Sequence, residues 1–229
     1  MSENGSIEHC AELAAFARLL SLGFGEPDDD ALAEIAAIAQ GLGARPGGRD
    51  AVAELVEALN GVFASGLAGE CARLFDGEVR CPPYEGSYEA DPFRHARQMA
   101  DVAGFYRAFG AEVSGERPDH AGAELEFLSF LAARRVAALA AGEEESAEIC
   151  RRAEDSFLLD HLGRWFPTFC RSVAREAHSP FYAALARLGE HAVRRELSRR
   201  GLVPAPLSPR RRFAVEADVV ECAAPAEPM

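Results

Sequence analysis

The strongest constraint on the fold of this chain is the spacing of its apolar residues, which recur every three to four positions along almost the whole sequence. This period is typical of helices that turn one face toward a protein core. The apolar residues are mainly Ala and Leu, and few are β-branched, which favours helix over strand. No alternating pattern longer than a few residues predicts a strand. The sequence therefore predicts an all-α, single-domain bundle of about ten helices.

Capping residues, glycines and prolines divide this pattern into separate helices. The expected helices, in chain order, cover residues 6–22, 28–41, 50–63, 67–75, 91–109, 119–141, 147–155, 157–175 with a break at Pro167, and 180–200. We expect the helical domain to extend over residues 1–203. The segment 204–229 contains repeated prolines, and we expect it to be a mobile C-terminal tail.

The net charge of −13 argues against nonspecific binding to nucleic acid or to an anionic membrane surface. It is compatible with a basic partner segment, such as a leader peptide that contains arginine. No apolar run approaches the roughly 18 residues of a membrane span, and the first residues lack the features of a secretory signal. No Cys-x-x-Cys pair is present, so no cysteine metal site is predicted. We expect a cytoplasmic protein without nucleic-acid or membrane partners.

The segment 81–88 interrupts the helical pattern, because two prolines and a glycine exclude a continuous helix. It carries Tyr84 and Tyr88, and Phe93 follows it. Aromatic side chains on such a segment can line a groove for an apolar peptide, and they can equally seal the core. The residues alone leave both interpretations open.

The segment 116–120, Glu116-Arg117-Pro118-Asp119-His120, precedes the apolar stripe of the helix expected over residues 119–141. It has the composition of a helix start. Proline is accepted in the first turn of a helix, and acidic residues favour the positive end of the helix dipole. We therefore expect a helix from Asp119, whose carboxylate accepts backbone N–H bonds there. We expect Glu116 and Arg117 to pair in solvent, with little effect on stability.

His120 and Glu124 are four residues apart and share a helix face with Phe127. Such a pair can ligate a metal, transfer protons, bind a donor on a ligand, or simply fix the start of the helix. Asp160 and His161 would add ligands if they folded nearby, which leaves a helical metal-dependent hydrolase as an alternative. No nucleotide-binding glycine loop, nucleophile elbow or zinc-protease motif is present. The preferred interpretation therefore assigns no catalytic residue, metal or cofactor.

The Glu-x-Pro-Asp-His pattern over residues 116–120, with the acidic and apolar helix after it, resembles the motif of the TorD/DmsD/NarJ-type chaperones that mature molybdenum oxidoreductases. Within that family the chain looks closest to the delta-type chaperones of dimethylsulfide, ethylbenzene, selenate and chlorate enzymes. The resemblance extends to the family's Tyr-Glu-Ser-x-Tyr segment, to the helix before the motif and to its C-terminal half, here residues 83–88, 100–110, 157–169 and 181–186. Gly86 departs from the family pattern.

The resemblance implies an all-helical chaperone, not an enzyme. Such a chaperone binds the N-terminal leader, often a twin-arginine signal, of the apo catalytic subunit of a molybdoenzyme. It holds this subunit until the molybdenum cofactor is inserted, and so delays export. A stable accessory subunit of the finished oxidoreductase is an alternative, and both a monomer and a homodimer are compatible with the resemblance.

The residues and the resemblance together suggest a groove in which aromatic rings contact the apolar part of the leader and carboxylates receive its arginines. His120 would orient one of the carboxylates or contact the leader backbone. The expected peptide-binding residues are Tyr84, Tyr88, Phe93, Glu116, Asp119, His120, Glu124 and Phe127.

Overall fold

The computed structural model describes residues 3–44, 48–76, 80–113 and 116–207, and within these ranges the chain forms nine α-helices. The first four are α1 (Glu3–Gly23), α2 (Asp29–Gly43), α3 (Gly48–Ala58) and α4 (Ala64–Phe75). After the short 3-10 turn η1 (Glu85–Tyr88) come α5 (Pro92–Ala108), α6 (Ala121–Ala140), α7 (Glu144–Phe157), the π-helical turn η2 (Leu158–Leu162), α8 (Gly163–Glu176) and α9 (Pro180–Arg200). The only β-structure in the described residues is one isolated bridge, so the all-α prediction is confirmed.

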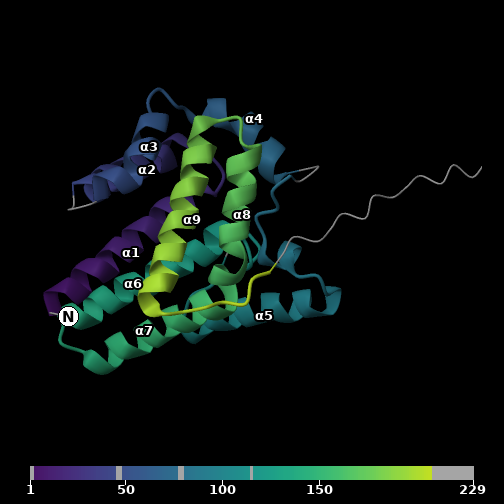
Figure 1. Cartoon of the computed structure of the whole chain (residues 1–229). Helices are drawn as coiled ribbons and strands as arrows, with labels where there is room; N and C mark the ends of the chain where they lie inside the picture. The colour runs from purple at the N-terminus through teal and green to yellow at the C-terminus, as the bar shows by residue number, and fades with distance from the viewer. Residues whose placement is uncertain (1–2, 45–47, 77–79, 114–115, 208–229) are drawn as a thin grey trace, which may run out of the picture.

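The expected count of about ten helices is slightly high, because α7, η2 and α8 follow one another without an intervening loop, although α7 and α8 run in different directions (Figure 1). The interruption expected at Pro167 is absent, and this residue lies inside α8. A proline has no N–H to donate to the carbonyl four residues earlier, which is that of Gly163. That carbonyl lies beside η2, where the hydrogen-bond pattern already changes, so the proline falls where a regular helix is already interrupted.

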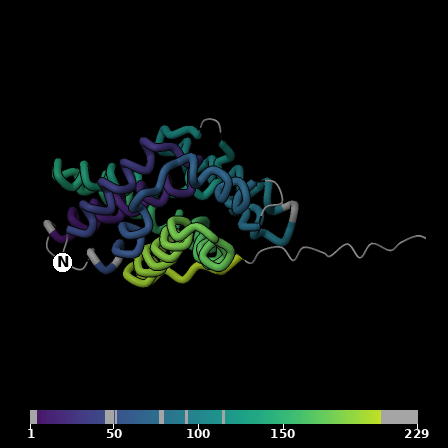
Figure 2. The backbone as a smooth tube through the Cα atoms, turned by 90° about the horizontal axis from the view of Figure 1, so that it is seen from above, coloured from purple at the N-terminus to yellow at the C-terminus, as the bar shows by residue number. Residues whose placement is uncertain are grey.

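The helices pack around one continuous core. α1 lies along α6, and α8 and α9 run side by side (Figure 1). Seen from above, the α8–α9 pair forms a layer on one side of the other helices (Figure 2). The centre of the core is aromatic, and its fully buried rings include Trp165, Phe166 and Phe169. None of the described helices is long and apolar enough to cross a membrane.

A buried polar cluster joins four helices at one end of the bundle. Glu154 of α7 is fully buried and accepts hydrogen bonds from Arg135 of α6 at 3.0 Å and from Arg200 of α9 at 2.7 Å. Arg200 also binds Glu196, whose Oε1 lies 3.0 Å from Nε2 of His9 on α1. We call Glu154, Arg135, Arg200, Glu196 and His9 the Glu154 cluster. Its charges are largely withdrawn from water, so each one depends on its partners.

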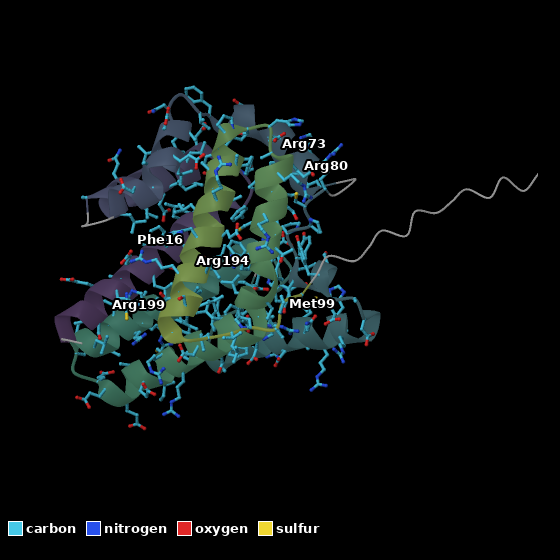
Figure 3. All side chains as sticks on the ribbon, in the orientation of Figure 1. Phe16, Arg73, Arg80, Met99, Arg194 and Arg199 are labelled. Carbon is cyan, nitrogen blue, oxygen red and sulfur yellow. The ribbon has the colours of Figure 1, made fainter. Side chains whose placement is uncertain are left out.

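Side-chain and backbone contacts at both ends of α8 attach the neighbouring segments to this helix. Arg73 and Arg80, labelled in Figure 3, both contact Glu176 at the end of α8: Arg73 donates to its carbonyl at 2.6 Å, and Arg80 lies 3.5 Å from its carboxylate. After α9, the N–H of Leu207 donates to the carbonyl of Arg164 at 2.8 Å, and Leu207 is buried. The remainder of the expected tail, residues 208–229, lies outside the described residues.

Candidate functional site

Two segments far apart in the sequence lie side by side at the start of α6. The N–H of Ala121 donates to the carbonyl of Pro83 at 2.8 Å, and the N–H of Glu85 donates to that of Asp119 at 2.9 Å. The hydroxyl of Tyr106 closes the arrangement by donating to the carbonyl of Pro118 at 2.7 Å. The aromatic segment 81–88 and the motif 116–120 therefore form one structural unit. The sequence indicated that one segment interrupts the helical pattern and that the other starts a helix, but it did not show that the two segments pair.

The helix after the motif begins at Ala121, two residues later than predicted, and its cap is His120. Nδ1 of His120 accepts the N–H of Gly122 at 3.1 Å. Burial lowers the pKa of His120, although Glu116 and Asp119 act in the opposite direction. A neutral imidazole that accepts at Nδ1 carries its proton on Nε2. His120 can therefore donate one hydrogen bond to a ligand.

From the sequence we expected the carboxylate of Asp119 to bind the start of its own helix. It does not, because it faces the segment 81–88. Asp119 is 1% exposed, and its Oδ2 accepts the N–H of Gly86 at 3.1 Å. Arg117 donates to both carboxylate oxygens, at 3.0 and 2.8 Å. The solvent pair expected between Glu116 and Arg117 is therefore absent. The carboxylate of Glu116 instead accepts the hydroxyl of Tyr84 at 3.3 Å and the backbone N–H of Arg117 at 2.8 Å.

Other residues of the expected site face the core. Glu124 is fully buried, and its Oε2 accepts Nε1–H of Trp165 at 3.0 Å. Tyr88 is 1% exposed and packs on the same Trp165 ring at 5.3 Å between centroids. Phe127 is mostly buried against Tyr106. Phe93 belongs to α5, but its side chain lies outside the described residues. In this arrangement Glu124 and Tyr88 cannot reach a peptide at the surface.

Replacing Glu124 with glutamine is expected to leave the free energy of unfolding at neutral pH unchanged or higher. Burial raises the pKa of Glu124 well above its usual value, and the nearby carboxylate of Glu85 raises it further, against the hydrogen bond from Trp165. A carboxyl with a raised folded pKa contributes full stability below its unfolded pKa and loses it as the pH rises toward the folded pKa. The variant keeps an acceptor for Trp165. Its free energy of unfolding, measured with urea, should therefore decline less steeply from pH 5 to 8 than that of the wild type. A steeper decline would contradict a protonated Glu124.

The alternative of a metal-dependent hydrolase is not supported, because three of its four residues, His120, Glu124 and His161, have other partners. Nδ1 of His161 lies 3.1 Å from Oε2 of Glu85, a residue 76 positions away in the sequence, and both side chains are buried. Glu124 binds Trp165 and His120 caps α6. Among the described residues, no group of three or more His, Cys, Asp or Glu side chains is arranged to hold a metal. Spacing in the sequence gave no sign of the pair between Glu85 and His161.

A groove of about 1050 Å³ opens beside the paired segments. It lies between the end of α1, α4, the end of α5 and the first turns of α6. Its aromatic lining residues are Phe24, Phe75, Tyr84, Tyr106, Phe127 and Phe130. Its acidic lining residues are all exposed, namely Glu26, Asp76, Glu112, Glu116 and Glu126. The described residues that line the groove include no arginine.

Of the eight peptide-binding residues expected from the sequence, the structure brings Tyr84, Glu116, His120 and Phe127 together in this groove. Asp119 lies directly behind Tyr84 and His120 without lining it. Glu26, Asp76, Glu112 and Glu126 were not among the residues expected from the sequence. The first three come from loops and helix ends, and their acidic character was the only signal for them.

Comparison with known proteins relates this region to one family. The model of the family described as nitrate reductase delta subunit matches residues 43–171, which include both paired segments and Trp165. A selenate reductase assembly chaperone protein of Thauera selenatis is 35% identical over 119 residues, which cover 50% of this chain and 60% of that protein. A chlorate reductase assembly chaperone protein of Ideonella dechloratans is 33% identical over 109 residues, or 45% of this chain and 55% of that protein. The matched part of this chain thus spans less than two thirds of each of these relatives.

A solved structure agrees over a larger part of the chain. The crystal structure of a proposed redox enzyme maturation protein from Archaeoglobus fulgidus superposes with a TM-score of 0.57 at 26% sequence identity. The superposition covers 79% of this chain and 93% of that one. The helical architecture that places the groove is therefore shared with a solved protein.

Proposed function

This chain belongs to the nitrate reductase delta subunit family of molybdoenzyme chaperones, and on that premise we propose that it assists the assembly of a molybdenum-containing oxidoreductase. The resemblance seen in the sequence is thereby confirmed, and the chain is a chaperone, not an enzyme. Its partner in the proposal is the apo form of the catalytic subunit. The chain binds the N-terminal leader of that subunit, of the twin-arginine type, and holds it until the molybdenum cofactor is inserted.

The charge of the groove carries this proposal. Five exposed carboxylates surround a floor of largely buried aromatic rings, and the described residues of the lining include no arginine. One of the five, Glu126, pairs at 3.4 Å with Arg18, which lies outside the lining. Glu26, Asp76 and Glu112 form no ion pair with any residue that the structure describes. Such a surface attracts a segment that combines positive charge with apolar side chains. A leader with adjacent arginines followed by an apolar run has this composition.

The size and donor pattern of the groove also suit a peptide. Its volume of about 1050 Å³ lies just above the range of roughly 300–1,000 Å³ that is typical of small-molecule pockets. Carboxylates bind guanidinium groups through charge-assisted hydrogen bonds, and Nε2–H of His120 can donate to a peptide carbonyl. In the proposal, one copy of the chain binds the leader. Because the leader is bound before export, the proposal places the chain in the cytoplasm.

The proposal predicts that replacing Glu26 and Glu112 together with glutamine weakens leader binding roughly fivefold to thirtyfold, because each exposed charge contributes about 0.5–1 kcal/mol. The probe is a synthetic peptide with two adjacent arginines followed by an apolar run, and the measurement is isothermal titration calorimetry at low and at physiological salt. The loss should shrink as salt screens the charges.

A matched control replaces Glu144 and Glu145, two exposed carboxylates at the start of α7, with glutamine. This variant has the same net charge and should bind like the wild type. A second control is a peptide with glutamine in place of both arginines. If the wild-type protein binds both peptides equally, or if the two double variants lose the same affinity, the groove is not the leader site.

A further inference from the structure

The guanidinium of Arg117 is enclosed on three sides. Asp119 accepts its Nε and Nη2 at 3.0 and 2.8 Å, and Nε2 of His95 lies 2.8 Å from the same Nη2. The guanidinium carbon lies 4.3 Å from the centroid of the Tyr84 ring. We call Asp119, His95 and Tyr84 the guanidinium cage. A bidentate carboxylate, a nitrogen acceptor and an aromatic face select a planar guanidinium over an ammonium group.

Contacts that do not involve Arg117 hold the residues of this cage in place. The N–H of Gly86 holds Oδ2 of Asp119 at 3.1 Å, and the bridge between Tyr84 and His120 fixes the aromatic wall. His95 packs directly on Gly86, where a Cβ would come within 2.0 Å of the imidazole ring. Glycine is therefore required there while His95 keeps its place. Its departure from the family pattern has a local reason in the wall of the cage.

The cage lies at the edge of the groove. Its Tyr84 wall lines the groove together with Glu116 and His120. The side chain of Arg117 is 41% exposed, whereas Asp119 is 1% exposed beneath it. Arg117 therefore covers a buried carboxylate from the solvent side. Without a guanidinium, Asp119 would keep only the N–H of Gly86 and the more distant His95 at 3.5 Å.

We propose that the cage is a binding subsite for one arginine of the client leader, and that Arg117 occupies it when no client is bound. This inference rests on the function proposed above. Exchange of one guanidinium for another keeps the buried carboxylate paired throughout, so the exchange avoids the cost of an isolated buried charge. Arg117 competes from within the same loop, which lowers the apparent affinity and rejects segments without an arginine.

Replacing Arg117 with alanine tests the proposal. The variant should bind ethylguanidinium, detected by NMR shifts of the Gly86 amide, while the wild type binds it far more weakly. It should also bind the diarginine peptide several-fold more tightly than the wild type does. A dilysine peptide should show no such gain, because an ammonium group cannot fill the bidentate site. Arg107→Ala, at an exposed arginine of α5, is the control and should change neither affinity.

The two proposals fail in different ways. A folded Arg117→Ala variant that does not bind ethylguanidinium overturns the cage, even where the diarginine peptide still binds the groove. If ethylguanidinium binds but neither protein binds the peptide, the proposed function fails, and with it the role of the cage in client binding. If the variant does not fold, the NMR signal of the Arg117 Nε–H in the wild type tests whether this guanidinium leaves the cage when the peptide binds. That signal should change when the peptide is added, and an unchanged signal in a bound complex overturns the exchange.

Discussion

Replacing Arg200 with methionine is expected to lower the free energy of unfolding by about 3–5 kcal/mol, the usual cost of removing one partner from a buried ion pair. The side chain of Arg200 is 10% exposed and contacts the carboxylates of Glu154, Asp155 and Glu196. Methionine retains much of the apolar stem, so the loss reports mainly on the charge. The fully buried Glu154 would keep only Arg135 as a cationic partner. Urea unfolding at pH 7, followed by circular dichroism, measures the change.

The same variant should alter the response to acid. Burial would raise the pKa of Glu196, but His9 and Arg200 lower it to about 2, from an ordinary value of 4.5. A carboxyl with a lowered folded pKa stabilises the protein above its unfolded pKa, and this contribution is lost as the pH falls through the folded value. Stability of the wild type should therefore decline between pH 4.5 and 2. Without Arg200, the decline over this window should be shallower.

Arg195→Met is the matched control, because it makes the same substitution on the same helix. Arg195 is 51% exposed and lies 3.1 Å from Glu12, so its loss should cost less than about 1 kcal/mol. Equal losses for the two variants would show that the Glu154 cluster is not an interdependent buried network.

The helices themselves could be predicted because they depend on local chemistry. Asp28 was expected to begin a helix, and its carboxylate indeed accepts the N–H of Ala31 at 2.7 Å. The start of α6 was misplaced because several residues there have helix-starting chemistry, and tertiary contacts decide among them. Asp119 binds Gly86 and Arg117, which leaves His120 to cap the helix. The π turn η2 could not be predicted from the spacing of apolar residues, since one widened turn changes that spacing very little.

The candidate site was harder to predict than the fold because its contacts join distant segments. Glu124 shares a helix face with the apolar Phe127 and Leu128, and this was a usable sign that it is buried. Its partner Trp165, 41 positions away, could not be inferred from spacing. Tyr84 and the motif were both recognised, yet only the structure shows that they pair and that carboxylates from other loops complete the groove.

Replacing Gly163 with alanine is expected to destabilise the protein by roughly 1–3 kcal/mol, the usual cost of overpacking a core. A Cβ at this position would lie 2.3 Å from the carbonyl oxygen of Leu158 and 2.9 Å from Cγ of Pro204. The first contact is with backbone, which cannot rotate away as a side chain can. Relief of the clash requires η2 to shift, and that movement would carry His161 away from Glu85. Urea unfolding, with the His161 NMR signals as a local probe, measures both effects.

Gly104→Ala supplies a control of opposite sign. Gly104 lies inside α5, and outside its own helical turn a Cβ there would meet no heavy atom of the described residues within 4 Å. Alanine is favoured over glycine in a helix interior by about 1 kcal/mol, so this variant should be more stable than the wild type. The two substitutions add the same methyl group to helical glycines and differ only in surroundings. If Gly163→Ala were also stabilising, the close approach of the Leu158 carbonyl, and with it the π turn between α7 and α8, would be contradicted.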